Sequence, residues 1–284
     1  MLLFDIDGVI RNVSGSYRRA IQATVHHYGG WTPEVAAIDA LKGEGLWNND
    51  WDASLELLRR HRGPAASGDK PLPGLEEVAE VFSRFYFGGD PLGPPALWQG
   101  FIRDEPLLVE SAFFAGLSAA GMAWGFVSGA ETPSARFLLE DRLGLLQAPL
   151  VAMEDAPQKP DPTGLLALAE RLLAPWSPKP GPQAPPVAYL GDTVADVETV
   201  CRARERWPEQ RFLALAVAPP HLHGPERTDQ RRDYEHQLLA AGADHLLART
   251  ADLGVAPADL IASLLEDRES RSRSRVSWKT PNQP

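Results

Sequence analysis

The first eight residues, MLLFDIDG, form an apolar run that ends in two acidic residues and a glycine. Side chains two positions apart point to the same side of a strand, so Asp5 and Asp7 would emerge together from a buried strand. Two such carboxylates can bind a divalent cation and divide nucleophilic and acid/base work. The alternatives are a strand that ends in an Asx turn, and a calcium loop, whose final glutamate is missing here. We therefore predict a buried strand that ends in functional carboxylates.

The composition is that of a globular protein without a nucleic-acid or membrane partner. A chain of 284 residues is long enough for one large domain or a core with a small insert. Its hydrophobic share of 44% and charged share of 23% are ordinary for a globular protein. A net charge of -10 disfavours nucleic-acid binding, and no apolar stretch approaches the ~20 residues of a membrane span. The single Cys201 permits no internal disulfide, and the apolar start lacks the basic residues of a signal peptide. We expect a cytoplasmic monomer or homodimer.

Two blocks with different hydrophobic periodicity divide the chain. The first shows helical spacing at residues 17–28, 33–41, 50–61 and 75–87, and the Gly/Pro-rich residues 88–95 follow it as a linker. The second alternates predicted helices and strands. Its helices are expected at 107–120, 132–143, 163–173 and 194–206, and its strands at 122–127, 149–153, 187–190 and 212–217. Such alternation predicts parallel strands with right-handed crossovers.

We therefore predict an α/β fold with a doubly wound, Rossmann-like parallel sheet and an inserted α-helical domain. The core would comprise residues 1–13 and 96–265, and the insert residues 14–95. The last segment, residues 266–284, alternates arginine and serine and is expected to be disordered. Such a basic tail can touch anionic surfaces, but a solvated terminus is the favoured interpretation.

Three further polar patches follow predicted strands. Ser128 and Gly129 could hydrogen-bond a phosphoryl group, Lys159 could neutralise an anion, and Asp192 with Asp196 could bind a metal ion. Each patch also has a simpler explanation: a Ser-Gly turn, an exposed loop lysine, or a helix cap followed by a solvated acid. Their shared position favours a site, because the carboxyl ends of parallel strands meet at one edge of the sheet.

Together these residues resemble the haloacid dehalogenase-like (HAD) hydrolase superfamily. Its four motifs match Asp5-Ile6-Asp7-Gly8-Val9, Ser128, Lys159, and Gly191-Asp192 with Asp196. The helical insert is similar to the type-1 cap of subfamily I. Residues 17–21 and 48–52 also resemble an uncharacterised branch of subfamily IA, which brings no known substrate.

The resemblance implies a phosphoryl-transfer mechanism for these positions. Asp5 would form an aspartyl-phosphate, and Asp7 would protonate the leaving oxygen and then activate water. Ser128, Gly129 and Lys159 would hold the transferring group. The resemblance also implies Mg²⁺ as the cofactor, at a site formed by Asp5, the backbone carbonyl of Asp7, Asp192 and Asp196.

The presence of Asp7 and Asp192 favours a phosphatase that acts on a small phosphorylated metabolite, because a dehalogenase of this superfamily needs neither acid/base carboxylate nor metal. A phosphosugar mutase would use the same residues and ranks second. A phosphonatase ranks third, because it needs a lysine in the cap and only Lys42 and Lys70 are candidates. A non-catalytic binding protein that keeps the fold is the alternative from another class.

Substrate specificity is expected to come from the cap, which would exclude water from the site. The candidate substrate-binding residues there are Arg18 and Asn49, with Arg19 and Asn48 as further possibilities. Exposed helix faces are the alternative for the two arginines. Arg11 stands where relatives commonly carry an acidic or small polar residue, and a surface ion pair is favoured over a substrate contact.

Overall fold

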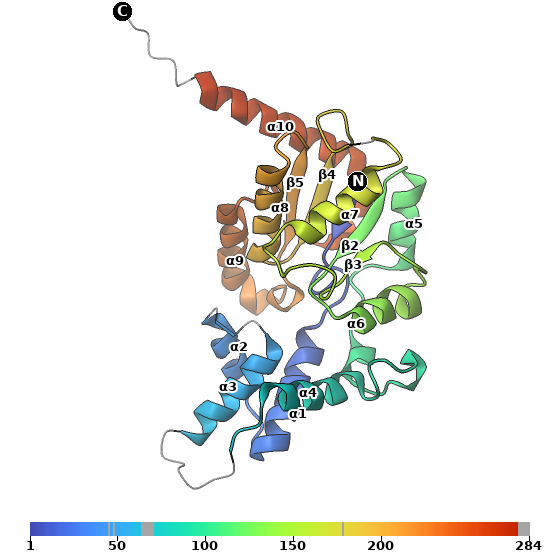
Figure 1. Ribbon diagram of the computed structural model, residues 1–284. Helices are drawn as coiled ribbons and strands as arrows, with labels where there is room; N and C mark the ends of the chain where they lie inside the picture. Colours follow the sequence, from blue (N-terminus) through green and yellow to red (C-terminus); the bar gives the residue numbers. More distant parts are fainter. Residues whose placement is uncertain (45, 48, 64–70, 178, 278–284) are drawn as a thin grey trace, which may run out of the picture. The chain divides into compact units, whose positions relative to one another are not determined.

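The computed structural model describes residues 1–44, 46–47, 49–63, 71–177 and 179–277, and the chain forms two compact units. The core unit consists of Met1–Asn12 with Leu107–Pro284, and the helical unit of Val13–Pro106 (Figure 1). The helical insert therefore ends later than the expected residue 95. Candidate cap residue Asn48 and the cap lysine Lys70 lie outside the described residues.

The core unit contains a six-stranded sheet in the order β3-β2-β1-β4-β5-β6, and every neighbouring pair of strands is parallel. The predicted doubly wound α/β class is thus confirmed. The strands are β1 (Leu2–Phe4), β2 (Trp124–Val127), β3 (Leu150–Val151), β4 (Val187–Gly191), β5 (Phe212–Val217) and β6 (His245–Leu247). They read as apolar runs because helices cover both faces of the sheet.

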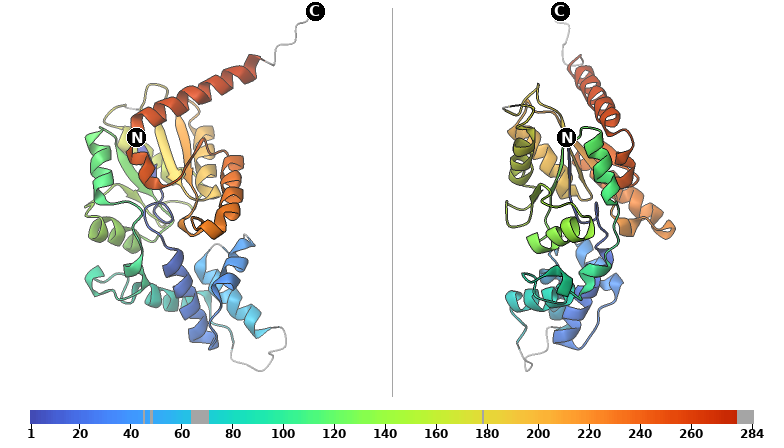
Figure 2. Two further views of the ribbon diagram at one scale, coloured as in Figure 1. Left: turned by 180° about the vertical axis from the view of Figure 1, so that it is seen from behind. Right: turned by 90° about the vertical axis from the view of Figure 1, so that its right-hand side faces the viewer.

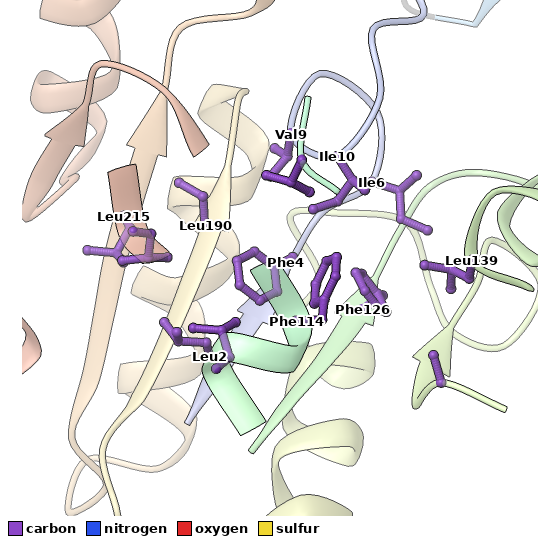
Figure 3. Packing of buried hydrophobic residues seen from close by; sticks show 14 of the residues in the cluster. Leu2, Phe4, Ile6, Val9, Ile10, Phe114, Phe126, Leu139, Leu190 and Leu215 are labelled. Carbon is purple, nitrogen blue, oxygen red and sulfur yellow. The ribbon is translucent and has the colours of Figure 1, made fainter. Parts of the chain in front are cut away.

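Alternation along β1 sends its side chains to two separate apolar layers. Leu2 and Phe4 join one layer and Leu3 joins the other, and all three are fully buried. In the first layer the ring of Phe4 lies 5.9 Å from that of Phe114 and 6.1 Å from that of Phe126 (Figure 3). These edge and tilted ring contacts fix the strand from which Asp5 emerges.

Helices cover the two faces of the sheet (Figure 2, right). Helices α5 and α10 pack on the layer with Phe4, and α7 and α8 pack on the layer with Leu3. The core helices are α5 (Ser111–Ala119), α6 (Thr132–Arg136), the π-helical η3 (Phe137–Arg142), α7 (Thr163–Leu173), α8 (Val194–Arg206), α9 (Thr228–Ala241) and α10 (Pro257–Ser277). Short 3-10 turns occupy η4 (Pro220–Leu222), η5 (Pro225–Arg227) and η6 (Thr250–Gly254).

The carboxyl-terminal part of the core differs most from expectation. Helix α9 and strand β6 had no predicted counterpart, since α9 is largely polar and buries only Leu238 fully. Helix α10 continues to Ser277, whereas composition predicted disorder from residue 266. The Arg/Ser alternation contains no proline or glycine before Pro281, and arginine favours helix, so the backbone can remain helical.

The helical unit contains four helices and two short 3-10 turns among its described residues. They are α1 (Ser14–Gly29), α2 (Val35–Gly43), α3 (Asp50–Arg62), α4 (Leu75–Phe87), η1 (Pro95–Leu97) and η2 (Phe101–Asp104). The unit extends beyond the predicted linker because the ring of Trp98 packs 4.7 Å from that of Phe87. Gly88 and Gly100 pass so closely that a Cβ on Gly88 would lie 2.1 Å from the Gly100 nitrogen. Along the described parts of the chain, no helix has the length and apolar character of a membrane span.

We predict that the α5 face of the core is a major source of stability. Leu117→Ala should lower the free energy of unfolding by about 2–5 kcal/mol, because Leu117 is 1% exposed within the packed layer. Leu146, which is 77% exposed, provides the matched control, and Leu146→Ala should change it by less than about 0.5 kcal/mol. Urea unfolding of both variants measures the difference, and equal effects would contradict this account of the core.

Candidate active site

Two acidic side chains follow adjacent strands at the same edge of the sheet. Asp5 comes directly after β1, where its backbone nitrogen donates to the Leu190 carbonyl at 2.8 Å, and Asp192 comes directly after β4. Phe4 pairs with Leu190 in the parallel register, so the two strands end side by side. Asp5 is 7% and Asp192 8% exposed. The fold therefore places two almost buried carboxylates next to each other.

Lys159 lies between two of the carboxylates. Its Nζ is 2.8 Å from Asp5 Oδ1 and 2.6 Å from Asp196 Oδ1. Burial acts to lower the pKa of Lys159, but the charges of Asp196 and Asp5 outweigh it and raise that pKa well above its ordinary value. Lys159 is therefore a permanent cation in the site, and it can donate hydrogen bonds to an anion.

The carboxylate of Asp196 is engaged on both oxygens. Oδ1 accepts from Lys159, and the Tyr189 hydroxyl lies 3.0 Å from the same atom. Oδ2 accepts from the Thr193 nitrogen at 3.0 Å and the Thr193 hydroxyl at 2.6 Å, in a capping box that begins α8. Burial acts to raise the pKa of Asp196, but Lys159 and the bonds from Thr193 hold it below its usual range. Asp196 is thus a fixed anion that orients Lys159.

Among the described residues, Asp5, Asp192 and Asp196 form a buried acidic group whose ligand atoms all lie within 4.8 Å of one another. Burial raises the pKa of Asp5 to about 7 despite the Lys159 ammonium, with the charges of Asp196 and Asp7 adding to the effect. Burial likewise raises the pKa of Asp192 well above its usual value. Carboxylate oxygens suit hard divalent cations, and a bound cation would offset this crowding of negative charge. Asp5 and Asp192 therefore fit such an ion, and Asp196 adds a fixed negative charge beside them.

Two glycines allow the backbone to approach these acids. A Cβ on Gly8, which has φ +77°, would lie 1.9 Å from Asp192 Oδ2. A Cβ on Gly191 would lie 2.2 Å from the Cβ of Asp196. Any larger residue at either position must displace an acidic side chain, which explains the glycine that follows Asp7 and the one that precedes Asp192.

Ser128 and Gly129 follow β2, the other neighbour of β1. The backbone nitrogen of Ser128 donates to the Val151 carbonyl at 2.9 Å, and its hydroxyl accepts from the Ala130 nitrogen at 3.1 Å. Ser128 is 5% exposed and Gly129 is exposed. Since β2 pairs with β1 in register, this turn lies at the same edge of the sheet as Asp5. A hydroxyl there can donate to an anionic oxygen.

Asp7 and Arg11 form an ion pair, but the pair is not the surface pair that was expected for Arg11. Arg11 Nε donates to Asp7 Oδ1 at 2.7 Å. The expectation of a surface position for Arg11 is wrong, because its side chain is 1% exposed while that of Asp7 is 24% exposed. The tight turn after Gly8 brings the two residues together, and a buried guanidinium needs such a partner.

The proposed substrate residues of the insert have partners within the helical unit. Arg18 pairs with Asp39, and its Nε–Oδ1 distance is 2.8 Å. Asn49 caps α3 by accepting from the nitrogens of Trp51 and Asp52. Arg19 bonds Asp104, and Lys42 lies 2.5 Å from Asp50. The substrate contacts expected of Arg18 and Asn49 stay a prediction.

Sequence reasoning missed the aromatic hydroxyls of the site. Tyr189 looked like an apolar residue of a buried strand, yet its hydroxyl lies 3.0 Å from both Asp196 Oδ1 and the Val127 carbonyl. Tyr234 of α9 donates to the Asp192 carbonyl at 3.1 Å. The available signal was that a buried tyrosine needs a polar partner for its hydroxyl.

The chain belongs to the haloacid dehalogenase-like hydrolase family, which matches residues 1–203. This match confirms the family that the motifs indicated. An imidazoleglycerol-phosphate dehydratase from Phytophthora nicotianae is 34% identical over 201 residues, which cover 69% of this chain and 40% of the relative. The chain thus spans about two fifths of the length of that curated relative.

Solved structures of low sequence identity share the fold. A phosphonoacetaldehyde hydrolase-like protein from Oleispira antarctica has a TM-score of 0.62 at 15% identity, with 93% of this chain and 92% of that chain covered. A HAD family hydrolase from Deinococcus radiodurans, solved with bound phosphate and sodium, has a TM-score of 0.59 at 18% identity, with 93% and 96% covered. At these sequence identities the similarity shows a shared fold and nothing further.

We predict that the two glycines are required for cation binding. Gly8→Ala should weaken binding of a divalent cation at least about tenfold, because its Cβ displaces the Asp192 carboxylate. Gly191→Ala should also lower the melting temperature, because it pushes the Cβ of buried Asp196. Gly116→Ala is the matched control, since nothing lies within 4 Å of its Cβ position. Calorimetric titration and thermal unfolding measure both effects, and unchanged binding in Gly8→Ala would contradict this view of the site.

Proposed function

We propose that this protein is a Mg²⁺-dependent phosphatase that hydrolyses a small phosphorylated metabolite through an aspartyl-phosphate intermediate. The observation that carries the proposal is the buried ammonium of Lys159 between Asp5 and Asp196, beside Asp192. A phosphoryl group adds negative charge to a site that already holds three carboxylates. Permanent positive charge is therefore needed for that group to bind, and Lys159 with a divalent cation would supply it.

The first half of the reaction would transfer the phosphoryl group to the protein. A carboxylate oxygen of Asp5 attacks phosphorus while the bond from phosphorus to the leaving oxygen breaks. Asp7 donates its proton to that oxygen, so the product leaves as a neutral alcohol. Lys159 and the Ser128 hydroxyl donate hydrogen bonds to the phosphoryl oxygens. Mg²⁺, held by Asp5, Asp192 and the backbone carbonyl of Asp7, would offset their charge.

The second half would return the protein to its starting state. Asp7, now a carboxylate, accepts a proton from a water molecule whose oxygen attacks phosphorus. The bond between phosphorus and Asp5 breaks, inorganic phosphate leaves, and Asp7 is again protonated. Asp196 would act through Lys159 in both halves, because its oxygens are already engaged by Lys159, Thr193 and Tyr189. We therefore assign Asp196 to positioning Lys159 rather than to direct metal binding.

The curated relative provides a first hypothesis for the substrate class. The relative from Phytophthora nicotianae is named for an enzyme of imidazoleglycerol phosphate, which is a phosphate monoester of a small alcohol. Dehydration itself needs no aspartyl nucleophile, and this chain aligns with only 40% of that relative. We propose a phosphorylated imidazole alcohol as the first substrate to test, within a wider panel of phosphorylated metabolites.

The proposed function predicts metal-dependent phosphate release. Wild type should release phosphate from at least one ester with Mg²⁺ and lose this activity in EDTA. Asp5→Asn removes the nucleophile and should lower kcat by at least about 10³-fold with the fold intact, as judged by circular dichroism. Isomerisation of a phosphosugar without phosphate release would instead indicate the mutase alternative. No turnover of any ester by folded protein would contradict catalysis of either kind.

The pKa shifts predict how cation binding depends on pH. The pKa of the Asp5 carboxyl group is raised to about 7, above the ordinary Asp value of about 3.9. Between these two pH values the folded protein keeps a proton on Asp5, whereas the unfolded chain has lost it. Without metal, this group lowers stability progressively as pH rises through that range. Mg²⁺ would take the place of the proton, so the melting-temperature increase that excess Mg²⁺ produces should be larger at pH 8 than at pH 5. An equal increase at both pH values, or one retained in Asp192→Asn, would contradict the assigned site.

A further inference from the structure

Arg11 is a buried cation that the mechanism above leaves without a role. Its guanidinium contacts two side chains of the core unit: Nε donates to Asp7 Oδ1 at 2.7 Å, and one terminal nitrogen donates to Ser134 Oγ at 2.7 Å. The other terminal nitrogen lies 3.5 Å from the Ser134 carbonyl oxygen. Arg11 is therefore anchored to α6 on one side and holds the Asp7 carboxylate on the other.

The backbone fixes Arg11 as firmly as its side chain does. Arg11 forms a β-bridge with Asp7 and a second, antiparallel bridge with Leu107. Its carbonyl accepts from the Gly8 nitrogen at 2.9 Å, which closes the turn between the two residues. The guanidinium is therefore held at a constant place relative to Asp5 and Asp7, both of which lie on the same short segment.

Asp7 needs such an anchor more than the other acids of the site do. Its side chain is 24% exposed, whereas Asp5 and Asp192 are nearly buried. A carboxylate in contact with water can rotate between several orientations, and proton transfer requires one of them. A guanidinium that occupies one oxygen at 2.7 Å restricts the carboxylate to a narrow range of orientations.

We propose that Arg11 is a positioning residue that holds the Asp7 carboxylate in the orientation required to protonate the leaving oxygen. The inference rests on the proposed phosphatase function and adds a residue to its acid/base step. In that step the Asp7 proton passes to the leaving oxygen as its bond to phosphorus breaks, and the bonding electrons stay on that oxygen. Arg11 keeps its own protons throughout, since a guanidinium does not deprotonate in proteins.

The leaving group provides a test that separates positioning from general damage. An alkyl phosphate expels a strongly basic alkoxide, which requires a proton from Asp7. The p-nitrophenolate of p-nitrophenyl phosphate is weakly basic and leaves without one. Loss of a correctly held acid should therefore selectively slow phosphoryl transfer from alkyl phosphates to Asp5, whereas a distorted site would slow this transfer from both esters alike.

The experiment measures kcat and KM for an alkyl phosphate that wild type hydrolyses and for p-nitrophenyl phosphate, with saturating Mg²⁺. Arg11→Met keeps an unbranched apolar stem and removes every donor, so kcat/KM for the alkyl ester, which reports phosphoryl transfer to Asp5, should fall about 10²-fold and kcat/KM for the aryl ester less than about threefold. The later hydrolysis of the aspartyl-phosphate is common to both esters and does not enter kcat/KM. In Asp7→Asn the acid is lost completely, so this variant gives the limiting ratio of kcat/KM for the alkyl ester to that for the aryl ester. Arg11→Lys should not restore the ratio, because an ammonium lacks the planar fork that reaches both partners.

Ser134→Ala keeps the Arg11–Asp7 ion pair but removes the hydroxyl that anchors Arg11. It should lower the ratio of kcat/KM for the alkyl ester to that for the aryl ester severalfold. This variant tests the inference if Arg11→Met does not fold. An unchanged ratio in Ser134→Ala and Arg11→Met, or full rescue by lysine, would overturn the inference. If wild type hydrolyses no alkyl phosphate of the metabolite panel and no p-nitrophenyl phosphate, the proposed function itself fails. If wild type hydrolyses both and the variants slow both equally, only the role of Arg11 fails.

Discussion

The charge of Lys159 is the feature on which the rest of the site depends. Three acidic side chains lie buried within a few ångströms of one another, an arrangement that is unfavourable without compensation. Lys159 contacts two of them, and Thr193 and Tyr189 complete the bonding of Asp196. As a result the pKa of Asp196 is lowered, while burial still raises those of Asp5 and Asp192. Asp196 is therefore held as an anion, whereas Asp5 and Asp192 are the acids at which, in the proposed function, a cation would replace a proton.

The parallel sheet explains why these residues meet although they are far apart in the chain. Asp5, Ser128 and Asp192 each follow a strand, and β1 lies between β2 and β4. The apolar layer around Phe4 fixes β1 from one side, so the position of Asp5 depends on core packing. Gly8 completes the arrangement by leaving space for the Asp192 carboxylate that follows β4, and Gly191 by leaving space for Asp196 in α8. The chemistry and the stability of the core are thus coupled through one central strand.

Much of this arrangement could be predicted from the sequence because apolar runs followed by acids are local patterns. The strands from β1 to β5 and the acids that follow β1 and β4 were found in this way. Helix α9 was missed because its buried face is limited to Leu238, and β6 because His245–Leu247 is too short to show a period. Arg11 and Tyr189 were misjudged for another reason. Arg11 is buried against Asp7 and Ser134, and the Tyr189 hydroxyl is buried against Asp196 and the Val127 carbonyl. No local sequence pattern reveals these contacts.

The central claim is that Asp5 is the nucleophile of a phosphatase site organised by Lys159. The most direct measurement is acid quenching of the protein during turnover, followed by peptide mass spectrometry. The account predicts a phosphoryl group on Asp5 that forms with substrate and Mg²⁺ and is absent from Asp5→Asn. A phosphoryl group on another residue, or turnover with no phosphorylated protein at any time, would contradict it.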